Sequence, residues 1–393
     1  MTSRLTLYPR LCLLALAAAF AFAVLSGDGS STASGRLGGD YPAFYTAGTL
    51  VTEGRLGDLY DPAAQAAVQR DLLGGEDGYL AFAYSPAVAA LYAPLAALPY
   101  RTSYLVHTVL MVAALVGALW LIRPLVPLVD RWFSLVLAAT VTSYPVFMAV
   151  GGGQNTALTM VLLAVIWRSL ADDREVAAGI AAALMLFRPQ YGLPMIGLLL
   201  IGRHHRAAAT AVAGAAVTFL ANATLLGWSW IGSWLDQVGP FLETDAEVNA
   251  ANSVSALGFL QAVLGTESAV ALVLGATASL IVGAVLVWTW WGDHADLGGR
   301  MAVTAIGLIL LSPHAMFYDA GLVAFTLLVL VDRRIVEWTA AAAVWALALA
   351  HLSRGALGAS PFALVVAAVF VFVARELTIG PNRSADLTLA VSA

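Results

Sequence analysis

The feature that most constrains the fold of this chain is a series of long apolar runs that follow one another from residue 9 to residue 374. The hydrocarbon core of a bilayer is about 30 Å thick, so a helix that crosses it needs about 20 apolar residues. Soluble domains have roughly 25% charged residues, whereas this chain is 11% charged and 61% hydrophobic. The runs therefore predict an all-α integral membrane protein, with residues 1–393 forming a single polytopic domain.

The apolar runs divide into about twelve transmembrane helices by the length rule. These cover residues 9–26, 102–122, 132–150, 155–170, 175–187, 190–201, 207–226, 267–291, 300–312, 316–331, 335–351 and 360–374. The segment Tyr84–Leu98 is apolar but rich in proline, and we expect it to lie in the outer interface as a helix. Residues 27–101 then form a long first outer loop that carries short juxtamembrane helices.

The first apolar run leaves two alternatives open. It follows Arg4 and Arg10, which is typical of a signal peptide, but it is nearly long enough to span a bilayer. We expect an uncleaved first span, because the multispan protein that follows needs no separate export signal. Cys12, the one cysteine, lies in this run, so the chain cannot form an internal disulfide.

The basic residues orient the predicted spans. Lysine is absent, and all nineteen basic residues are arginines, a bias that suggests a GC-rich bacterial genome. Loops on the cytoplasmic side carry an excess of basic residues. A cytoplasmic amino terminus places thirteen arginines inside: Arg4, Arg10, Arg123, Arg131, Arg168, Arg174, Arg203, Arg206, Arg300, Arg333, Arg334, Arg375 and Arg383. We therefore expect a bacterial cytoplasmic membrane protein with both termini inside and a cytoplasmic tail over residues 375–393.

This orientation gathers the polar segments on the outer face. They are residues 27–83, Gly151–Asn155, Phe187–Gln190, residues 227–255 and Ser312–His314. Ionisable residues at the membrane boundary are costly and usually functional, and their position on one side favours a site at the outer leaflet over a channel. The net charge of −5 comes with no basic stripe, so nucleic-acid binding is not expected.

Asp40 is the acidic residue best placed at the edge of the membrane. Gly38 and Gly39 before it allow close approach of a substrate, and Tyr41 and Tyr45 after it offer rings for stacking a sugar. The alternative is that Asp40 only caps the helix that follows.

Arginine and histidine supply the candidate phosphate ligands. Arg188 lies between two short spans, and a guanidinium binds phosphate through two parallel hydrogen bonds; the alternative is a topology marker. His314 and Asp319 lie between two later spans and are candidates for binding phosphate or sugar hydroxyls, although an intramembrane histidine is as often a packing residue.

Amide side chains are the remaining candidates. Gln154 and Asn155 end a glycine-rich turn, and Asn252 lies in the outer loop 227–255. Amides suit sugar hydroxyls, but each of these residues is equally compatible with a helix cap. No paired-carboxylate motif has the spacing of a metal site.

In order and spacing, the polar stretches resemble glycosyltransferase family 87, the polyprenyl-phosphate-mannose-dependent α-mannosyltransferases, which have the GT-C membrane fold. The matching stretches are Gly39–Tyr45, Leu59–Asp61, Tyr84–Pro86, Ala93–Ala96, Gly153–Asn155, Ala178–Ile180, Phe187–Pro189, Asn252–Ser253, Ser312–His314 and Tyr318–Asp319. The family often has a Pro-Pro pair where this chain has Ser85-Pro86, and a lysine at the position of Arg188.

The resemblance implies a GT-C-type bundle and an inverting transferase that acts at the outer face. Its donor would be a polyprenyl-phosphate sugar, its acceptor a glycolipid or glycan, and it would need no metal or cofactor. Asp40 matches the catalytic aspartate of the family, and a general base typically contributes 10²–10⁴-fold. The family also has a functional histidine in the region of His314.

Two other functions remain open. One is a transporter or flippase of a lipid-linked sugar, although such proteins often contain inverted repeats and no convincing repeat relates the two halves of this chain. The other is a non-catalytic component of an envelope assembly pathway.

Overall fold

The computed structural model describes residues 3–26, 37–73, 80–292 and 294–379. The α-helices are α1 (Ser3–Ser26), α2 (Tyr41–Thr52), α3 (Pro62–Leu73), α4 (Pro86–Ala96), α5 (Tyr100–Ile122), α6 (Pro127–Arg131), α7 (Phe133–Val141), α8 (Tyr144–Gly151), α9 (Thr156–Ala171), α10 (Glu175–Leu184), α11 (Pro189–Ile201), α12 (His205–Leu226), α13 (Trp230–Asn249), α14 (Ala256–Leu264), α15 (Ala269–Trp290), α16 (Leu297–Leu311), α17 (Val323–Asp332), α18 (Trp338–Leu347), α19 (Arg354–Leu357) and α20 (Phe362–Ala374). In these ranges the β pairing amounts to an isolated bridge between Ser253 and Met316. Most of the predicted tail, residues 380–393 with Arg383, lies outside the described residues, as do residues 27–36 and 74–79 of the first loop.

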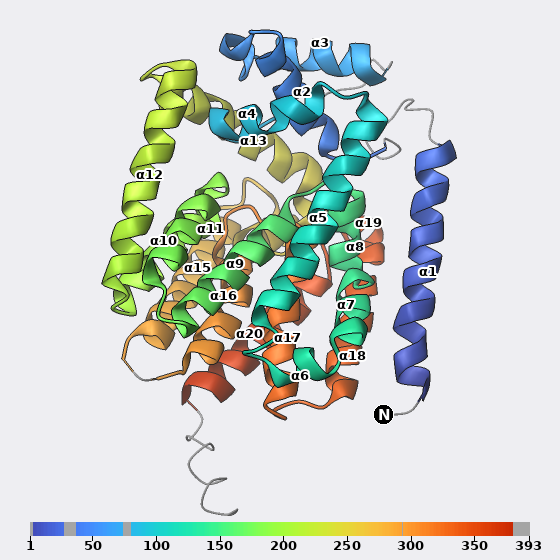
Figure 1. Ribbon diagram of the computed structural model, residues 1–393, viewed down its shortest axis with the longest axis vertical. Coiled ribbons are helices and arrows are strands. Elements are labelled where there is room, and N and C mark those ends of the chain that lie inside the picture. Colours follow the sequence, from blue (N-terminus) through green and yellow to red (C-terminus); the bar gives the residue numbers. More distant parts are fainter. Residues whose placement is uncertain (1–2, 27–36, 74–79, 293, 380–393) are drawn as a thin grey trace, which may run out of the picture.

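The helices form a bundle around α9 and α16, as Figure 1 shows. Almost every residue of α16 from Gly299 to Leu310 is buried, and α15, α17 and α20 pack around it. α9 lies against α5 and α10, and α10 in turn packs on α12. The described residues thus form the all-helical bundle that the sequence predicts.

Fewer helices reach spanning length than the sequence predicts. Tyr100–Ile122, His205–Leu226, Ala269–Trp290 and Trp338–Leu357 are long and apolar enough to cross a membrane, and α7 with α8 would add a fifth span bent by 68°. Other apolar helices, such as α9 and α16, are shorter. A helix that is surrounded by protein does not have to match the lipid thickness by itself, because its neighbours shield its ends. The count of about twelve is not confirmed and stays a prediction.

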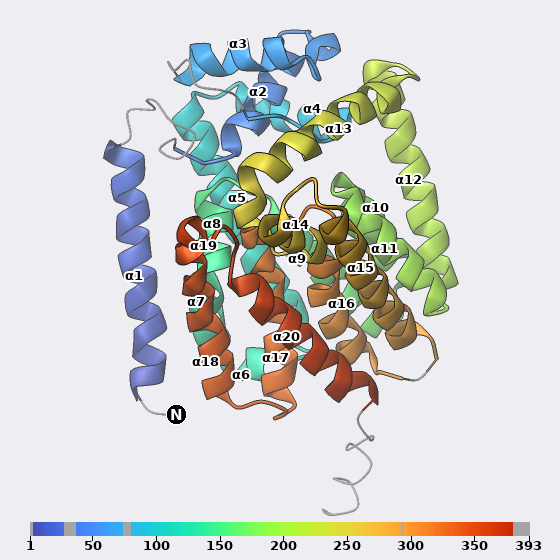
Figure 2. The same cartoon turned by 180° about the vertical axis from the view of Figure 1, so that it is seen from behind.

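Four helices, α2, α3, α4 and α13, gather at one end of the bundle, and we call them the end cap (Figure 1). α6 and the start of α1 lie at the opposite end, and the view from behind in Figure 2 agrees. α4 falls within the segment Tyr84–Leu98 that the sequence predicts to be helical, and it packs on α2 and α12.

The end cap has a small aromatic core of its own. Phe44 of α2 stacks on Tyr92 of α4 with ring centroids 4.8 Å apart, and it meets the ring of Phe82 edge-on at 6.2 Å. These rings are buried and form a cluster distinct from the core of the bundle. α2 and α4 also contact α5, and α4 contacts α12, which holds the residues that precede α2 in a defined place.

Candidate active site

Two glycine-rich loops meet at the junction of the end cap and the bundle. The backbone N–H of Asp40 donates to the carbonyl of Gly152 at 3.0 Å. Gly153 has a φ of +66°, and a Cβ there would lie 2.5 Å from Cβ of Tyr41. Only glycine allows this approach, which brings Asp40 next to Gln154.

The carboxyl group of Asp40 is half-buried and accepts a hydrogen bond from Nε2 of Gln154. Asp40 immediately precedes α2, but its side chain makes no capping hydrogen bond to that helix. The capping alternative requires such a bond, so the structure gives it no support. The pKa of the Asp40 carboxyl is raised above its usual value of 3.8, chiefly because burial disfavours the charged form; the bond from Gln154 opposes this and the negative charge of Asp245 adds to it.

A polar chain continues from Gln154 into the bundle. Oε1 of Gln154 accepts from Nη2 of Arg188 at 3.4 Å, and Nη1 of Arg188 donates to Oδ1 of Asp319. Asp319 also accepts from Oγ1 of Thr156 at 3.0 Å and from the backbone N–H of Met316 at 3.2 Å. The chain thus joins Asp40, before α2, to Asp319 in the 3₁₀ segment Phe317–Leu322.

Arg188 and Asp319 form a buried ion pair, with side chains 5% and 3% exposed. The Nε atom of Arg188 and Oδ1 of Asn155 are buried and have no hydrogen-bond partner among the described residues. Native proteins leave few buried polar atoms without a partner, and such atoms usually meet water or a ligand. Arg188 therefore keeps one free donor although its charge is balanced, and Asn155 at the start of α9 makes no capping bond.

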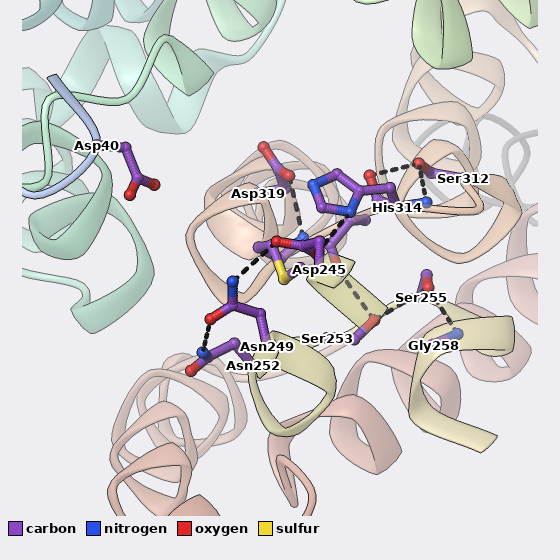
Figure 3. A network of polar contacts seen from close by, with 12 residues as sticks. Asp40, Asp245, Asn249, Asn252, Ser253, Ser255, Gly258, Ser312, His314 and Asp319 are labelled. Carbon is purple, nitrogen blue, oxygen red and sulfur yellow. Dashed lines mark hydrogen bonds and ion pairs between the residues drawn. The ribbon is translucent and has the colours of Figure 1, made fainter. Parts of the chain in front are cut away.

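His314 is held by a turn that begins at the end of α16. Oγ of Ser312 donates to the carbonyl of His314 at 2.8 Å and accepts from its N–H at 3.2 Å. Nδ1 of His314 lies 3.1 Å from Oδ2 of Asp245, a residue of α13. Figure 3 shows Asp40 on one side, facing the group that Asp319, His314 and Asp245 form.

The two predicted stacking tyrosines serve the packing of the end cap. Tyr41 is fully buried, its ring lies 4.8 Å from that of His107, and its hydroxyl is 2.5 Å from Oγ of Ser103. A ring without an exposed face cannot stack on a sugar, so this role is withdrawn for Tyr41. Tyr45 is half-buried and donates its hydroxyl proton to the carbonyl of Leu98 at 2.9 Å, and its contact with a sugar stays a prediction.

Asn252 lies in a second polar chain that the sequence reasoning missed. Its Oδ1 accepts from Nε of Arg354 at 2.5 Å, and its Nδ2 donates to Asn249 at 3.3 Å. Asp245, Asn249 and Arg354 look like solvated residues of the outer loops when only the local pattern is considered. The spacing of Asp245 and Asn249, one helical turn apart, was the one available signal.

Within the ranges that the structure describes, no three His, Cys, Asp or Glu side chains are grouped so as to hold an ion. The site therefore offers a half-buried carboxylate, Asp40, that is linked through Gln154 to the guanidinium of Arg188.

Comparison with known proteins identifies the family. The model of glycosyltransferase family 87 matches residues 82–313, which is more than half of the chain. No curated protein matches the chain. The matched segment contains Gln154, Arg188 and Asp245, and it ends one residue before His314. With this match across the helical bundle that carries the polar site, we conclude that this membrane protein is a glycosyltransferase and belongs to glycosyltransferase family 87.

Proposed function

We propose that this protein is an inverting mannosyltransferase that uses a polyprenyl-phosphate-mannose donor and a glycolipid or glycan acceptor. The reaction would take place at the outer face of the bacterial cytoplasmic membrane, with about twelve spans below it and both termini inside. The observation that carries the proposal is the carboxyl group of Asp40, which accepts a hydrogen bond from Gln154 and is joined through Gln154 to the guanidinium of Arg188.

In this reaction an acceptor hydroxyl attacks the anomeric carbon of the donor sugar. The hydroxyl proton passes to the carboxylate of Asp40, the new glycosidic bond forms, and the bond from the anomeric carbon to the phosphate oxygen breaks. Polyprenyl phosphate leaves with the bonding electron pair. A single displacement of this kind inverts the anomeric configuration.

The environments of the two carboxylates support Asp40 as the base. Asp319 is bound by Arg188, Thr156 and the Met316 N–H. Asp40 accepts one side-chain hydrogen bond among the described residues. A base works best when its pKa is close to the working pH, and the raised pKa of Asp40 moves it in that direction. Carboxylates with contrasting environments commonly divide their roles in this way.

The leaving phosphate needs cationic or N–H partners. Arg188 offers its unpartnered Nε, and His314 offers the ring nitrogen that does not face Asp245. Gln154, Asn155 and Asn252 are proposed near the sugar or acceptor hydroxyls. Of these, Asn155 has a buried oxygen without a partner, which a hydroxyl donor would satisfy.

An apolar cavity of about 410 Å³ supports a lipid-linked donor. Tyr8 and Cys12 of α1 line one side of it, and residues of α7, α17 and α18 line the others. The cavity reaches Ala320 and Gly321, directly after Asp319 in the chain. An apolar space that begins next to the polar site suits a molecule with a phosphate head and a hydrocarbon tail.

A bulky residue in this cavity should discriminate between donors by chain length. Ala341→Trp on α18 places an indole in the lining, and we expect it to raise KM for a long polyprenyl donor several-fold and to leave KM for a short-chain analogue nearly unchanged. Ala343→Trp changes an exposed position of the same helix and serves as the matched control. An equal effect of Ala341→Trp on both donors would contradict a tail-binding role.

The proposed reaction is tested by incubating the purified protein with polyprenyl-phosphate-mannose and lipid or glycan acceptors, followed by mass spectrometry. We expect free polyprenyl phosphate and a product heavier by one hexose. A transporter would instead move the intact donor from one leaflet of a proteoliposome membrane to the other without cleaving it. That result would replace the transferase by the alternative of a flippase.

The pH dependence of transfer follows from the raised pKa of Asp40. A general base must be ionised, so the rate should fall as the pH drops through the pKa of Asp40, with a midpoint above 3.8. The hydrogen bond from Gln154 lowers this pKa, so Gln154→Leu should move the acidic limb to higher pH. An acidic limb that Gln154→Leu leaves in place would show that another group controls it.

A further inference from the structure

The second polar chain connects three segments at the end of the bundle. Nε of Arg354, in α19, donates to Oδ1 of Asn252 at 2.5 Å, and Nδ2 of Asn252 donates to Oδ1 of Asn249 at 3.3 Å. Nδ2 of Asn249 donates to Oδ1 of Asp245 at 2.8 Å. Figure 3 shows the part of this chain that runs from Asn252 through Asn249 to Asp245 and His314. We call Arg354, Asn252, Asn249 and Asp245 the relay.

The relay has a single direction. Each amide accepts through its oxygen on the side of Arg354 and donates through its nitrogen on the side of Asp245. The network itself therefore sets the orientation of both amides. It begins at a cation and ends at a carboxylate, an arrangement in which each amide has a partner on both sides.

The other oxygen of Asp245 meets His314. Oδ2 of Asp245 lies 3.1 Å from Nδ1 of His314, and the two side chains are 12% and 22% exposed. A carboxylate only accepts hydrogen bonds, so Nδ1 must carry a proton. This contact fixes the ring orientation and leaves Nε2 as the atom available to a substrate. Carboxylates orient histidine rings in the same way in metal and catalytic sites.

Other contacts hold the same imidazole. The ring of Phe241, also in α13, meets that of His314 edge-on at 5.6 Å. Oγ of Ser312 forms hydrogen bonds with both the carbonyl and the N–H of His314. Exposed ion pairs are worth about 0–1 kcal/mol because two mobile side chains must be ordered. Here the relay already orders the Asp245 side chain, and Phe241 already orders the ring of His314. The ion pair between Asp245 and His314 therefore keeps His314 in one orientation.

We propose that Asp245 is the positioning residue of His314, and that Asn249, Asn252 and Arg354 hold Asp245 in place for this task. The ligand of the positioned imidazole is the phosphate of a polyprenyl phosphate, which Nε2 contacts while Nδ1 faces Asp245. The inference rests on the proposed function, because it assigns His314 to the leaving phosphate. It also changes the role of Asn252, which acts through Asn249 and Asp245 with its amide committed to the relay.

The test measures binding of polyprenyl monophosphate to the full-length protein in detergent. We expect Asp245→Asn and His314→Ala each to raise Kd about tenfold, as expected for the loss of a charge-assisted hydrogen bond. The double variant should bind no more weakly than His314→Ala alone, because Asp245 acts through His314. Glu247→Gln is the matched control, since it removes an exposed carboxylate from the same helix, and it should bind as the parent does.

Three results would overturn the proposal: parental binding by Asp245→Asn, multiplied effects in the double variant, or absence of polyprenyl monophosphate binding by the parent protein. Asn249→Ala interrupts the relay one residue earlier and provides the same test if Asp245→Asn does not fold. The outcome is separable from that of the proposed function. If mannose is not transferred but the relay variants weaken binding of polyprenyl monophosphate, only the proposed reaction is refuted. If mannose is transferred and Asp245→Asn binds polyprenyl monophosphate as the parent does, only the positioning role is refuted.

Discussion

Replacement of Asp40 by asparagine is expected to reduce sugar transfer by about 10²–10⁴-fold, the usual contribution of a general base. Asparagine has nearly the same size and still offers an oxygen to Nε2 of Gln154. It cannot take a proton from the acceptor hydroxyl. Binding of the lipid donor and the midpoint of thermal unfolding should therefore change little, and a transfer assay with a donor-binding assay separates the two effects.

Two aspartates of the same segment provide controls for Asp40. Asp58 is paired with exposed Arg55, and Asp61 accepts from the backbone N–H of Ala63 at the start of α3. Their asparagine variants should keep most of the activity. Near-parental transfer by Asp40→Asn would contradict the assignment of the base and would direct the search to Asp319.

Removal of the guanidinium by Arg188→Ala should cost about 3–5 kcal/mol of stability, because it leaves Asp319 buried without its cation. The variant should also lose the donor Nε that we propose for the phosphate. A double variant, Arg188→Met with Asp319→Leu, should regain much of the stability, since an apolar pair of similar volume often replaces a buried ion pair without loss. It should not regain transfer. Thermal unfolding and transfer rates measured on the same preparations test both statements.

A partly exposed pair of the same chemistry is the control for Arg188. Arg168 donates to Asp172 one helical turn away, with side chains 32% and 26% exposed. Arg168→Ala should change stability by less than about 1 kcal/mol. If Arg188→Ala folded and transferred sugar at the parental rate, Arg188 would mark only the topology of the chain.

The class of fold follows from the sequence alone. The apolar runs are sufficient for an all-helical membrane protein, because they contain too few charges for a soluble domain. The glycines beside Asp40 were expected to leave room for a substrate; in the structure, Gly39 instead lies against the backbone of Gly152. The segment Tyr84–Leu98, which is predicted to be helical, contains α4. Each of these inferences depends on residues that are neighbours in the chain.

Which polar residues meet depends on how the chain folds in three dimensions. Arg188 and Asp319 are 131 positions apart, and Asp245 reaches His314 from a different helix. Their pairing depends on how the helices cross, and no local pattern encodes this. The burial of Tyr41 beneath α4 and α5, which removes it from sugar stacking, was decided in the same way. Helix lengths could not be predicted from the sequence either. A helix that is enclosed by protein, such as α16, does not need to match the thickness of the lipid.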